Sequence, residues 1–134
     1  MGSSISQRSR ICLDTNYLVR GLLKDVRESA ELVQWRQHGE ILLTAAPAWY
    51  EFMCGPVSDR QIRVIRAFLS GGVTGFGEIQ AAEAARLFNA IGRTRRLRTD
   101  TMIAATAIVA GASLATSNIE DFRVFIPHGL KLVR

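Results

Sequence analysis

The feature that most constrains the fold is an alternation of short apolar segments with longer segments of helical period. The short segments have the length and composition of strands, and they are 11–13, 41–44, 73–76, 113–116 and 130–133. Between them the pattern predicts helices near 27–38, 58–70, 79–91 and 100–110. Strands joined to helices by short connections form right-handed crossovers, so we predict an α/β fold with α/β/α layers and a mostly parallel central sheet.

Two kinds of signal support the predicted helices. Asp25 with Glu28, and Ser58 with Gln61, have the spacing of a capping box at a helix N-terminus. The segment 102–110 is apolar on every side, which indicates a helix that is buried against the sheet. Both signals agree with the alternation of strands and helices.

The length of 134 residues fits one domain, and the hydrophobic fraction of 48% and charged fraction of 22% are typical of globular proteins. Residues 1–10 are polar and basic and have no apolar segment of the kind a secretory signal needs, so we expect a flexible N-terminal extension and a cytoplasmic protein. Residues 11–134 should form the single domain. Cys12 and Cys54 stand in apolar segments, and we expect free, buried thiols.

Four acidic residues stand where the predicted fold would gather them. Ligands of open parallel sheets bind beyond the carboxyl ends of the strands. Asp14 directly follows the first strand, Asp100 opens the apolar helix, and Asp121 comes soon after the strand 113–116. Glu51 is the single charged residue of an otherwise apolar helical segment. These four carboxylates are the candidate site.

Each of the four also has a purely structural interpretation. Asp14 would cap a helix that begins at Thr15, and Asp100 would complement a helix dipole. Glu51 would lie on an exposed helix face, and Asp121 would begin a turn. Together they favour a site, because carboxylates gathered in one crevice repel one another and need a multivalent cation. Oxygen ligands without a well-placed His or Cys favour Mg²⁺ or Mn²⁺ over zinc.

The other acidic residues of the predicted helices occupy polar positions. We interpret them as caps or as parts of solvated helix faces. They are Asp25, Glu28, Glu31, Glu78 and Glu83.

The basic residues permit an anionic partner, although a skewed genomic base composition would give the same excess of arginine. Seventeen Lys and Arg against 12 Asp and Glu give a net charge of +5. A carboxylate-held Mg²⁺ activates water and offsets the charge of a phosphodiester, so nucleic acid hydrolysis is the chemical hypothesis. Arginines cluster just before Asp100, where they would hold a phosphate backbone, although a solvated basic loop is the structural alternative. They are Arg93, Arg95, Arg96 and Arg98.

These segments together resemble the PIN-domain ribonucleases, and within them the VapC-type toxins of type II VapBC toxin–antitoxin modules. The likeness is carried by 13–19, the Glu51 helix, 100–107 and 114–122. It implies an endoribonuclease that depends on Mg²⁺ or Mn²⁺. The residues that match the family's acidic, metal-holding positions are Asp14, Glu51, Asp100 and Asp121, and those that match its supporting polar residues are Thr15, Thr116 and Asn118.

The resemblance also implies partners: an RNA substrate, a second copy of the chain in a homodimer, and a cognate VapB-like antitoxin whose tail occupies the site. No association with a membrane is expected. One departure from the family is the polar extension before Ile11, since such toxins often begin with the first strand. Two alternatives stay open, namely a catalytically inactive PIN-like RNA-binding or scaffold domain and a structure-specific DNA nuclease.

Overall fold

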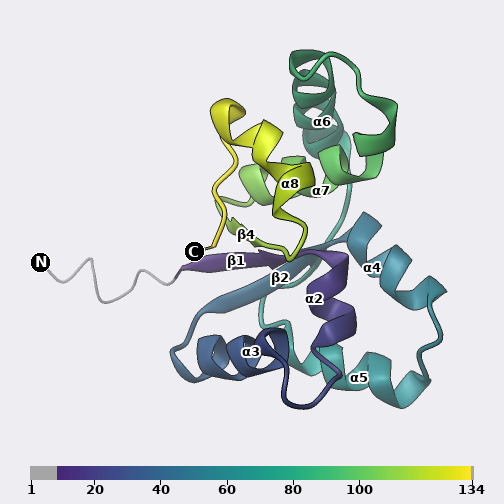
Figure 1. Cartoon of the computed structure of the whole chain (residues 1–134), viewed down its shortest axis with the longest axis vertical. Coiled ribbons are helices and arrows are strands. Elements are labelled where there is room, and N and C mark those ends of the chain that lie inside the picture. The colour runs from purple at the N-terminus through teal and green to yellow at the C-terminus, as the bar shows by residue number, and fades with distance from the viewer. Residues whose placement is uncertain (1–8, 134) are drawn as a thin grey trace, which may run out of the picture.

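A parallel four-stranded sheet forms the centre of the computed structural model, which describes residues 9–133 (Figure 1). The strand order is β3-β2-β1-β4. The strands are β1 (Arg10–Leu13), β2 (Ile41–Ala45), β3 (Gly72–Thr74) and β4 (Ser113–Ala115). The predicted α/β class is confirmed. Of the predicted flexible extension 1–10, residues 1–8 lie outside the described residues, and Arg10 already belongs to β1.

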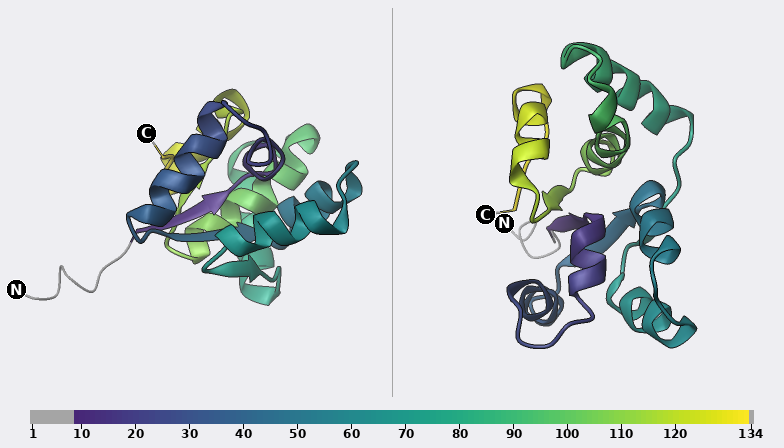
Figure 2. Two further views of the ribbon diagram at one scale, coloured as in Figure 1. Left: turned by 90° about the horizontal axis from the view of Figure 1, so that it is seen from below. Right: turned by 45° about the vertical axis from the view of Figure 1, so that its right-hand side comes forward.

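Helices cover both faces of the sheet, which gives the predicted three layers. Helices α2, α3 and α5 lie on one face, and α6, α7 and α8 lie on the other (Figures 1 and 2). Helix α4 follows β2 and contacts α2, α7 and β3. The helices are α2 (Thr15–Arg20), α3 (Arg27–Gln37), α4 (Ala46–Cys54), α5 (Asp59–Phe68), α6 (Glu78–Ala90), α7 (Arg98–Val109) and α8 (Ile119–Phe122), with 3₁₀ helices η1 (Arg95–Leu97) and η2 (Arg123–His128).

Helix α7 is the buried helix that its apolar sequence predicts. Ile103, Ala104 and Ala107 are fully buried, and α7 packs between α6 and the strands β2 and β4. The small alanine side chains let the helix approach its neighbours closely. Because α7 is fixed from several sides, its first turn, which carries Asp100, has a defined position relative to the sheet.

The strand register sets up the carboxyl edge of the sheet. Leu13 at the end of β1 is paired with Thr44 in β2 and with Ala115 in β4. The residues that follow, Asp14 and Thr116, therefore leave the sheet side by side. The Asp14 amide continues the ladder by donating to the Ala115 carbonyl at 2.9 Å.

One of the two predicted capping boxes is present. The Ser58 hydroxyl accepts from the Gln61 amide at 3.1 Å, and the Gln61 side chain accepts from the Ser58 amide at 2.9 Å. The box predicted from Asp25 and Glu28 is wrong, because Asp25 has a left-handed φ of 59° and α3 begins only at Arg27. The Glu28 carboxylate instead bonds to groups outside its own helix.

Two further expectations are corrected. The predicted strand 130–133 is reduced to a single bridge between Leu114 and Leu132, because η2 holds the chain up to His128 and β4 is only three residues long. Cys12 and Cys54 are both free thiols, but only Cys12 is buried. Cys54 is exposed because it lies in the last turn of α4.

Candidate active site

Asp14 stands at the carboxyl end of β1 and is held by donors from three residues. Its Oδ1 accepts from the Thr15 amide at 2.7 Å, and its Oδ2 accepts from the Thr116 hydroxyl at 2.7 Å and the Asn16 side chain at 3.3 Å. Asp14 is therefore the N-cap of α2, as its structural interpretation predicted. It is also only 5% exposed, so its carboxylate has a fixed orientation at the edge of the sheet.

Burial dominates the acid–base behaviour of Asp14. The pKa of Asp14 is raised above its usual value by burial, and the negative charge of Glu51 adds to this. Hydrogen bonds from Thr116, Thr15 and Asn16 act in the opposite direction, because they stabilise the charged form. A cation beside this carboxylate would favour its charged form.

Asp100 lies in the first turn of α7, where the negative charges of the other three acids act on it. Burial, followed by the negative charges of Asp14, Asp121 and Glu51, raises the pKa of Asp100 to about 7, while Arg96 acts to lower it. Mutual charge effects of this kind require the carboxylates to be near neighbours. The fold thus brings the four candidate acids to one region, although Asp14 and Asp121 are 107 positions apart in the sequence.

Glu51 and Asp121 are engaged by hydrogen bonds at the rim of this region. The Thr15 hydroxyl donates to Glu51 Oε1 at 2.7 Å. Asp121 accepts from Arg96 Nη1 at 2.8 Å and from the Asn118 side chain at 2.9 Å. The Arg96 guanidinium, and then the Asn118 amide, hold the pKa of Asp121 below its usual value.

The four acids are near one another without forming a closed cage. Among residues 9–133, no three Asp, Glu, His or Cys side chains converge closely enough to hold one ion. One oxygen of Glu51 is bonded to Thr15, and one oxygen of Asp121 is bonded to Arg96. The fold thus brings the four acids together, and the two at the rim, Glu51 and Asp121, accept hydrogen bonds from other residues of the protein.

The predicted arginine cluster divides into parts. Arg96 contacts the acidic region through Asp121. Arg93 and Arg98 instead lie over the Phe88 ring, at 5.6 and 5.3 Å from its centroid. Among residues 9–133, Arg95 forms no ion pair.

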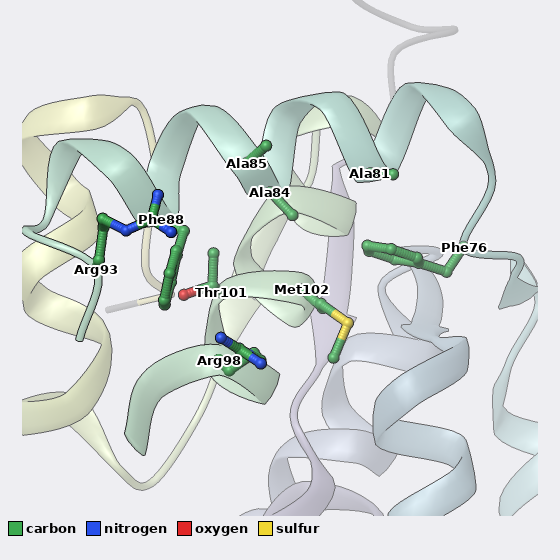
Figure 3. Close-up of a pocket in the computed structure, with 9 residues that line it drawn as sticks. All are labelled: Phe76, Ala81, Ala84, Ala85, Phe88, Arg93, Arg98, Thr101 and Met102. Atoms are coloured by element: carbon green, nitrogen blue, oxygen red, sulfur yellow. The ribbon is translucent and has the colours of Figure 1, made fainter. Parts of the chain in front are cut away.

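Arg93 and Arg98 line an apolar groove between α6 and α7. The groove has a volume of about 360 Å³, and none of the four candidate acids lines it. Figure 3 shows Phe88 and Arg93 toward one end and Phe76 with Met102 toward the other. These two arginines are therefore separated from the carboxylates that their sequence position suggested they would serve.

A second pocket adjoins the acidic region. It has a volume of about 230 Å³, lies among α2, α4 and the start of α5, and is mostly apolar. Glu51 is its acidic member, so an occupant of this pocket would contact a residue of the candidate site. The apolar residues that line it include Val19, Leu22, Leu23, Phe52 and Val57.

Sequence reasoning missed four polar residues beside the site: Asn16, Arg20, Glu28 and Ser117. Glu28 was assigned to a cap or solvated face, yet it is only 5% exposed and bonds to Arg20 and Ser117. Its helical position carries no signal of this, because the partners lie on other elements. Asn16 had a usable signal, since it follows Asp14 by two residues and so reaches the same edge.

Comparison with known proteins gives one family. A family model described as "PIN domain" matches residues 11–125. No curated protein matches the sequence. Within the described residues, no helix combines the length and apolar character that crossing a membrane requires.

Solved structures share the fold at low sequence identity. VapBC2 from Rickettsia felis bound to a promoter DNA fragment has a TM-score of 0.72 at 18% identity, over 92% of this chain and 97% of the other. DNA-bound VapBC from Salmonella typhimurium has a TM-score of 0.70 at 19% identity, over 93% and 97%. A toxin–antitoxin complex from Klebsiella pneumoniae has a TM-score of 0.64 at 24% identity, over 84% and 89%.

Proposed function

The chain belongs to the PIN domain family, and we propose that it is a metal-dependent endoribonuclease that acts as the toxin of a toxin–antitoxin pair. The observation that carries the proposal is the Asp14 carboxylate at the carboxyl edge of the sheet, which hydrogen bonds from Thr15, Asn16 and Thr116 hold in place. Asp100, Asp121 and Glu51 are its charged neighbours, and their charges add to burial in raising the pKa of Asp100. A fold that holds carboxylates against their mutual repulsion is suited to a cation. Structural similarity to a toxin–antitoxin complex supports the toxin role.

The donor set fits Mg²⁺ or Mn²⁺. It consists of carboxylate oxygens, which hard divalent cations prefer, and it lacks the sulfur and imidazole ligands typical of zinc. Asp14, Asp100 and Asp121 would hold the cation, and Glu51 would complete the group directly or through water. When bound, the cation would activate water and offset charge on the phosphodiester.

The protein's own residues would prepare this site in two ways. Thr15, Asn16 and Thr116 fix the Asp14 carboxylate by hydrogen bonds. Asn118 orients Asp121 through its side-chain amide. Because the four acids interact, they would titrate as a coupled unit, and no single one is assigned as the general base.

Basic residues around the acidic region would bind the RNA backbone. The net charge of +5 favours an anionic substrate. Arg96 is the arginine placed to contact a phosphate next to the carboxylates, because it already reaches Asp121. We propose that further phosphates of the RNA, at a greater distance from the site, are contacted by Arg93, Arg95 and Arg98.

The proposed partners are a VapB-like antitoxin and a second copy of the chain in a homodimer. The apolar pocket beside Glu51 is a candidate binding site for the antitoxin, because an apolar antitoxin segment bound there would contact Glu51, a carboxylate of the proposed site. Structural similarity to a toxin–antitoxin complex from Klebsiella pneumoniae supports the antitoxin partner.

The direct test is cleavage of RNA. Purified protein, freed of any partner, would be incubated with total cellular RNA in Mg²⁺ or Mn²⁺, and EDTA and Asp100→Asn protein would serve as controls. Discrete cleavage that is lost in both controls supports the proposal. A parallel digest of flap DNA distinguishes a structure-specific DNA nuclease, which would cut the DNA in preference to the RNA.

One observation favours a second candidate, an inactive PIN-like RNA-binding or scaffold domain. No three metal-ligating side chains converge within the described part of the chain. Calorimetry with Mn²⁺ separates the two functions, since the nuclease requires binding that Asp100→Asn weakens. Absence of Mn²⁺ binding by folded protein, together with RNA binding, would favour the scaffold.

A further inference from the structure

Glu28 is a buried carboxylate whose two oxygens are bound to different elements. Its Oε1 accepts from Arg20 Nε at 2.9 Å, at the end of α2. Its Oε2 accepts from the Ser117 hydroxyl at 2.7 Å, just beyond β4. Arg27 Nη2 lies 3.7 Å from the same Glu28 oxygen, Oε2. Burial of a charge is costly unless it is paired and hydrogen-bonded, and here both conditions are met.

Ser117 belongs to the turn 116–118, which supplies hydrogen bonds to the candidate acids. Thr116 on one side of it donates to Asp14, and Asn118 on the other side donates to Asp121. A hydrogen bond also links the two ends of the turn, because the backbone amide of Asn118 donates to the Thr116 hydroxyl oxygen at 2.9 Å. A shift of this turn would therefore displace both donors at once, the one bonded to Asp14 and the one bonded to Asp121.

Ser117 is itself held from two directions. Its hydroxyl is bound to Glu28, and its amide donates to Asn16 Oδ1 at 3.1 Å. The Asn16 side chain in turn donates to Asp14. Glu28 thus ties the turn to α3, which lies on the other face of the sheet from α7 (Figures 1 and 2).

We propose that Glu28 is a positioning residue of the acidic site, acting through Ser117 to hold the turn 116–118 against Asp14 and Asp121. The proposal rests on the proposed function, because it assigns Glu28 to the same site. Arg20 and Arg27 offset the charge of Glu28, so that it anchors the turn without adding to the repulsion among the four acids.

The competing explanation is that Glu28 only joins α2 to α3. A matched control exists for it, because the Tyr17 hydroxyl also joins these helices by donating to Glu31 Oε1 at 2.6 Å, and within residues 9–133 this hydroxyl makes no hydrogen bond to the turn. Tyr17→Phe therefore removes a comparable link between the helices. If Glu28 only joined the two helices, Glu28→Ala would affect the turn 116–118 no more than Tyr17→Phe does.

The first measurement is amide hydrogen exchange in the metal-free protein. In Glu28→Ala and in Ser117→Ala, the amides of residues 117 and 118 should exchange about tenfold faster than in the unmodified protein, while amides in α7 keep their rates. Glu28→Gln should restore most of the protection, because its side-chain amide still pairs with the Ser117 hydroxyl. Tyr17→Phe should leave the turn unchanged.

The second measurement is Mn²⁺ affinity by calorimetry. Hydrogen-bond partners of metal ligands typically contribute 10- to 100-fold, and Glu28 acts one contact further out, so Ser117→Ala and Glu28→Ala should each weaken binding by about 3- to 10-fold. The double variant should be no weaker than either single one, since both remove the same contact.

The outcomes separate the two proposals. Turn amides that exchange at unmodified rates in both Glu28→Ala and Ser117→Ala overturn the positioning role. Additive losses of Mn²⁺ affinity in the double variant overturn it as well. If the unmodified protein binds no Mn²⁺, the proposed nuclease function fails, while the exchange data still decide whether Glu28 holds the turn.

Discussion

Arg96 and Asp121 form an ion pair at the rim of the acidic region, with 2.8 Å between Arg96 Nη1 and Asp121 Oδ1. The two residues come from η1 and α8. The Arg96 side chain is 69% exposed and that of Asp121 is 30% exposed, so the pair contributes little to folding stability. Its effect is local: the guanidinium occupies an oxygen that a cation at the site would also use.

Arg96→Ala is therefore expected to increase Mn²⁺ affinity. An exposed pair of this kind is worth about 0.2–1 kcal/mol, which corresponds to a dissociation constant lowered by about 1.5- to 5-fold. Calorimetry measures this change, and the melting temperature should stay the same. Arg95→Ala is the control, because Arg95 lies beside Arg96 and forms no ion pair within residues 9–133. Weaker Mn²⁺ binding by Arg96→Ala than by Arg95→Ala would contradict the competition.

Asp100→Asn should abolish cleavage and stabilise the metal-free fold. The substitution removes a carboxylate that burial and neighbouring acids disfavour. In EDTA at pH 8 we expect the free energy of unfolding to rise by on the order of 1 kcal/mol, after allowance for solvent screening. Urea denaturation measures it. A stability loss in Asp100→Asn would show that the acids do not repel one another as the structure indicates.

Asp14→Asn provides the contrast. It should also abolish cleavage, but the Asp14 carboxylate accepts from Thr15, Asn16 and Thr116. An amide group turned toward these donors leaves one of them without an acceptor, so we expect a loss of about 1–3 kcal/mol in the same assay. Equal stabilities of the two variants would mean that the donors around Asp14 rearrange without cost.

The sequence predicted the parts of this molecule that depend on local pattern. Alternating strands and helices gave the parallel sheet, and the apolar segment 102–110 gave the buried helix α7. Asp14 could be placed because the residue after a parallel strand lies at the carboxyl edge whatever the partner strand is. The contact of Thr116 with Asp14 follows from the same geometry.

What the sequence could not predict depends on contacts between distant elements. Glu28 occupies a polar helix position like its neighbours, and only the arrangement of α2 and β4 buries it. The bond between Arg96 and Asp121 bridges 25 residues, and the stacking of Arg93 and Arg98 on Phe88 separates a continuous basic segment. Charge alone does not indicate where a side chain of this length will bind.

The Glu28 carboxylate should make stability depend on acid pH. Hydrogen bonds from Ser117 and Arg20 lower the pKa of Glu28 from 4.5 to about 2. A lowered folded-state pKa gives stability that is fully present above about pH 4.5 and is lost as pH falls through about 2. Glu28→Gln lacks this dependence. The stability difference between the two proteins, about 2 kcal/mol at pH 7, should shrink steadily below pH 4.5 in urea denaturation. A difference that stays constant from pH 6 to pH 2.5 would contradict the assigned pairing.

Gly21 at the end of α2 is expected to be required for space rather than for backbone freedom. Its φ of −61° is accessible to any residue. A Cβ at Gly21 would lie 2.6 Å from Leu32 Cδ1, 2.9 Å from the Tyr17 carbonyl oxygen and 3.2 Å from Ile65 Cδ1. The buried junction of α2, α3 and α5 has no room for it. Gly21→Ala should therefore destabilise the fold by about 1–3 kcal/mol.

Gly55 at the end of α4 is the matched control for Gly21. Within the described part of the chain and apart from its chain neighbours, a Cβ there would meet only the Phe52 carbonyl oxygen, at 3.4 Å, and the backbone is extended. Gly55→Ala should leave the free energy of unfolding unchanged or raise it by up to about 1 kcal/mol, because alanine reduces the freedom of the unfolded chain. Urea denaturation of both variants compares the two positions directly. If Gly21→Ala were as stable as Gly55→Ala, Leu32 and Ile65 would have to yield, and the packing that supports α2 behind Asp14 would be looser than the contacts show.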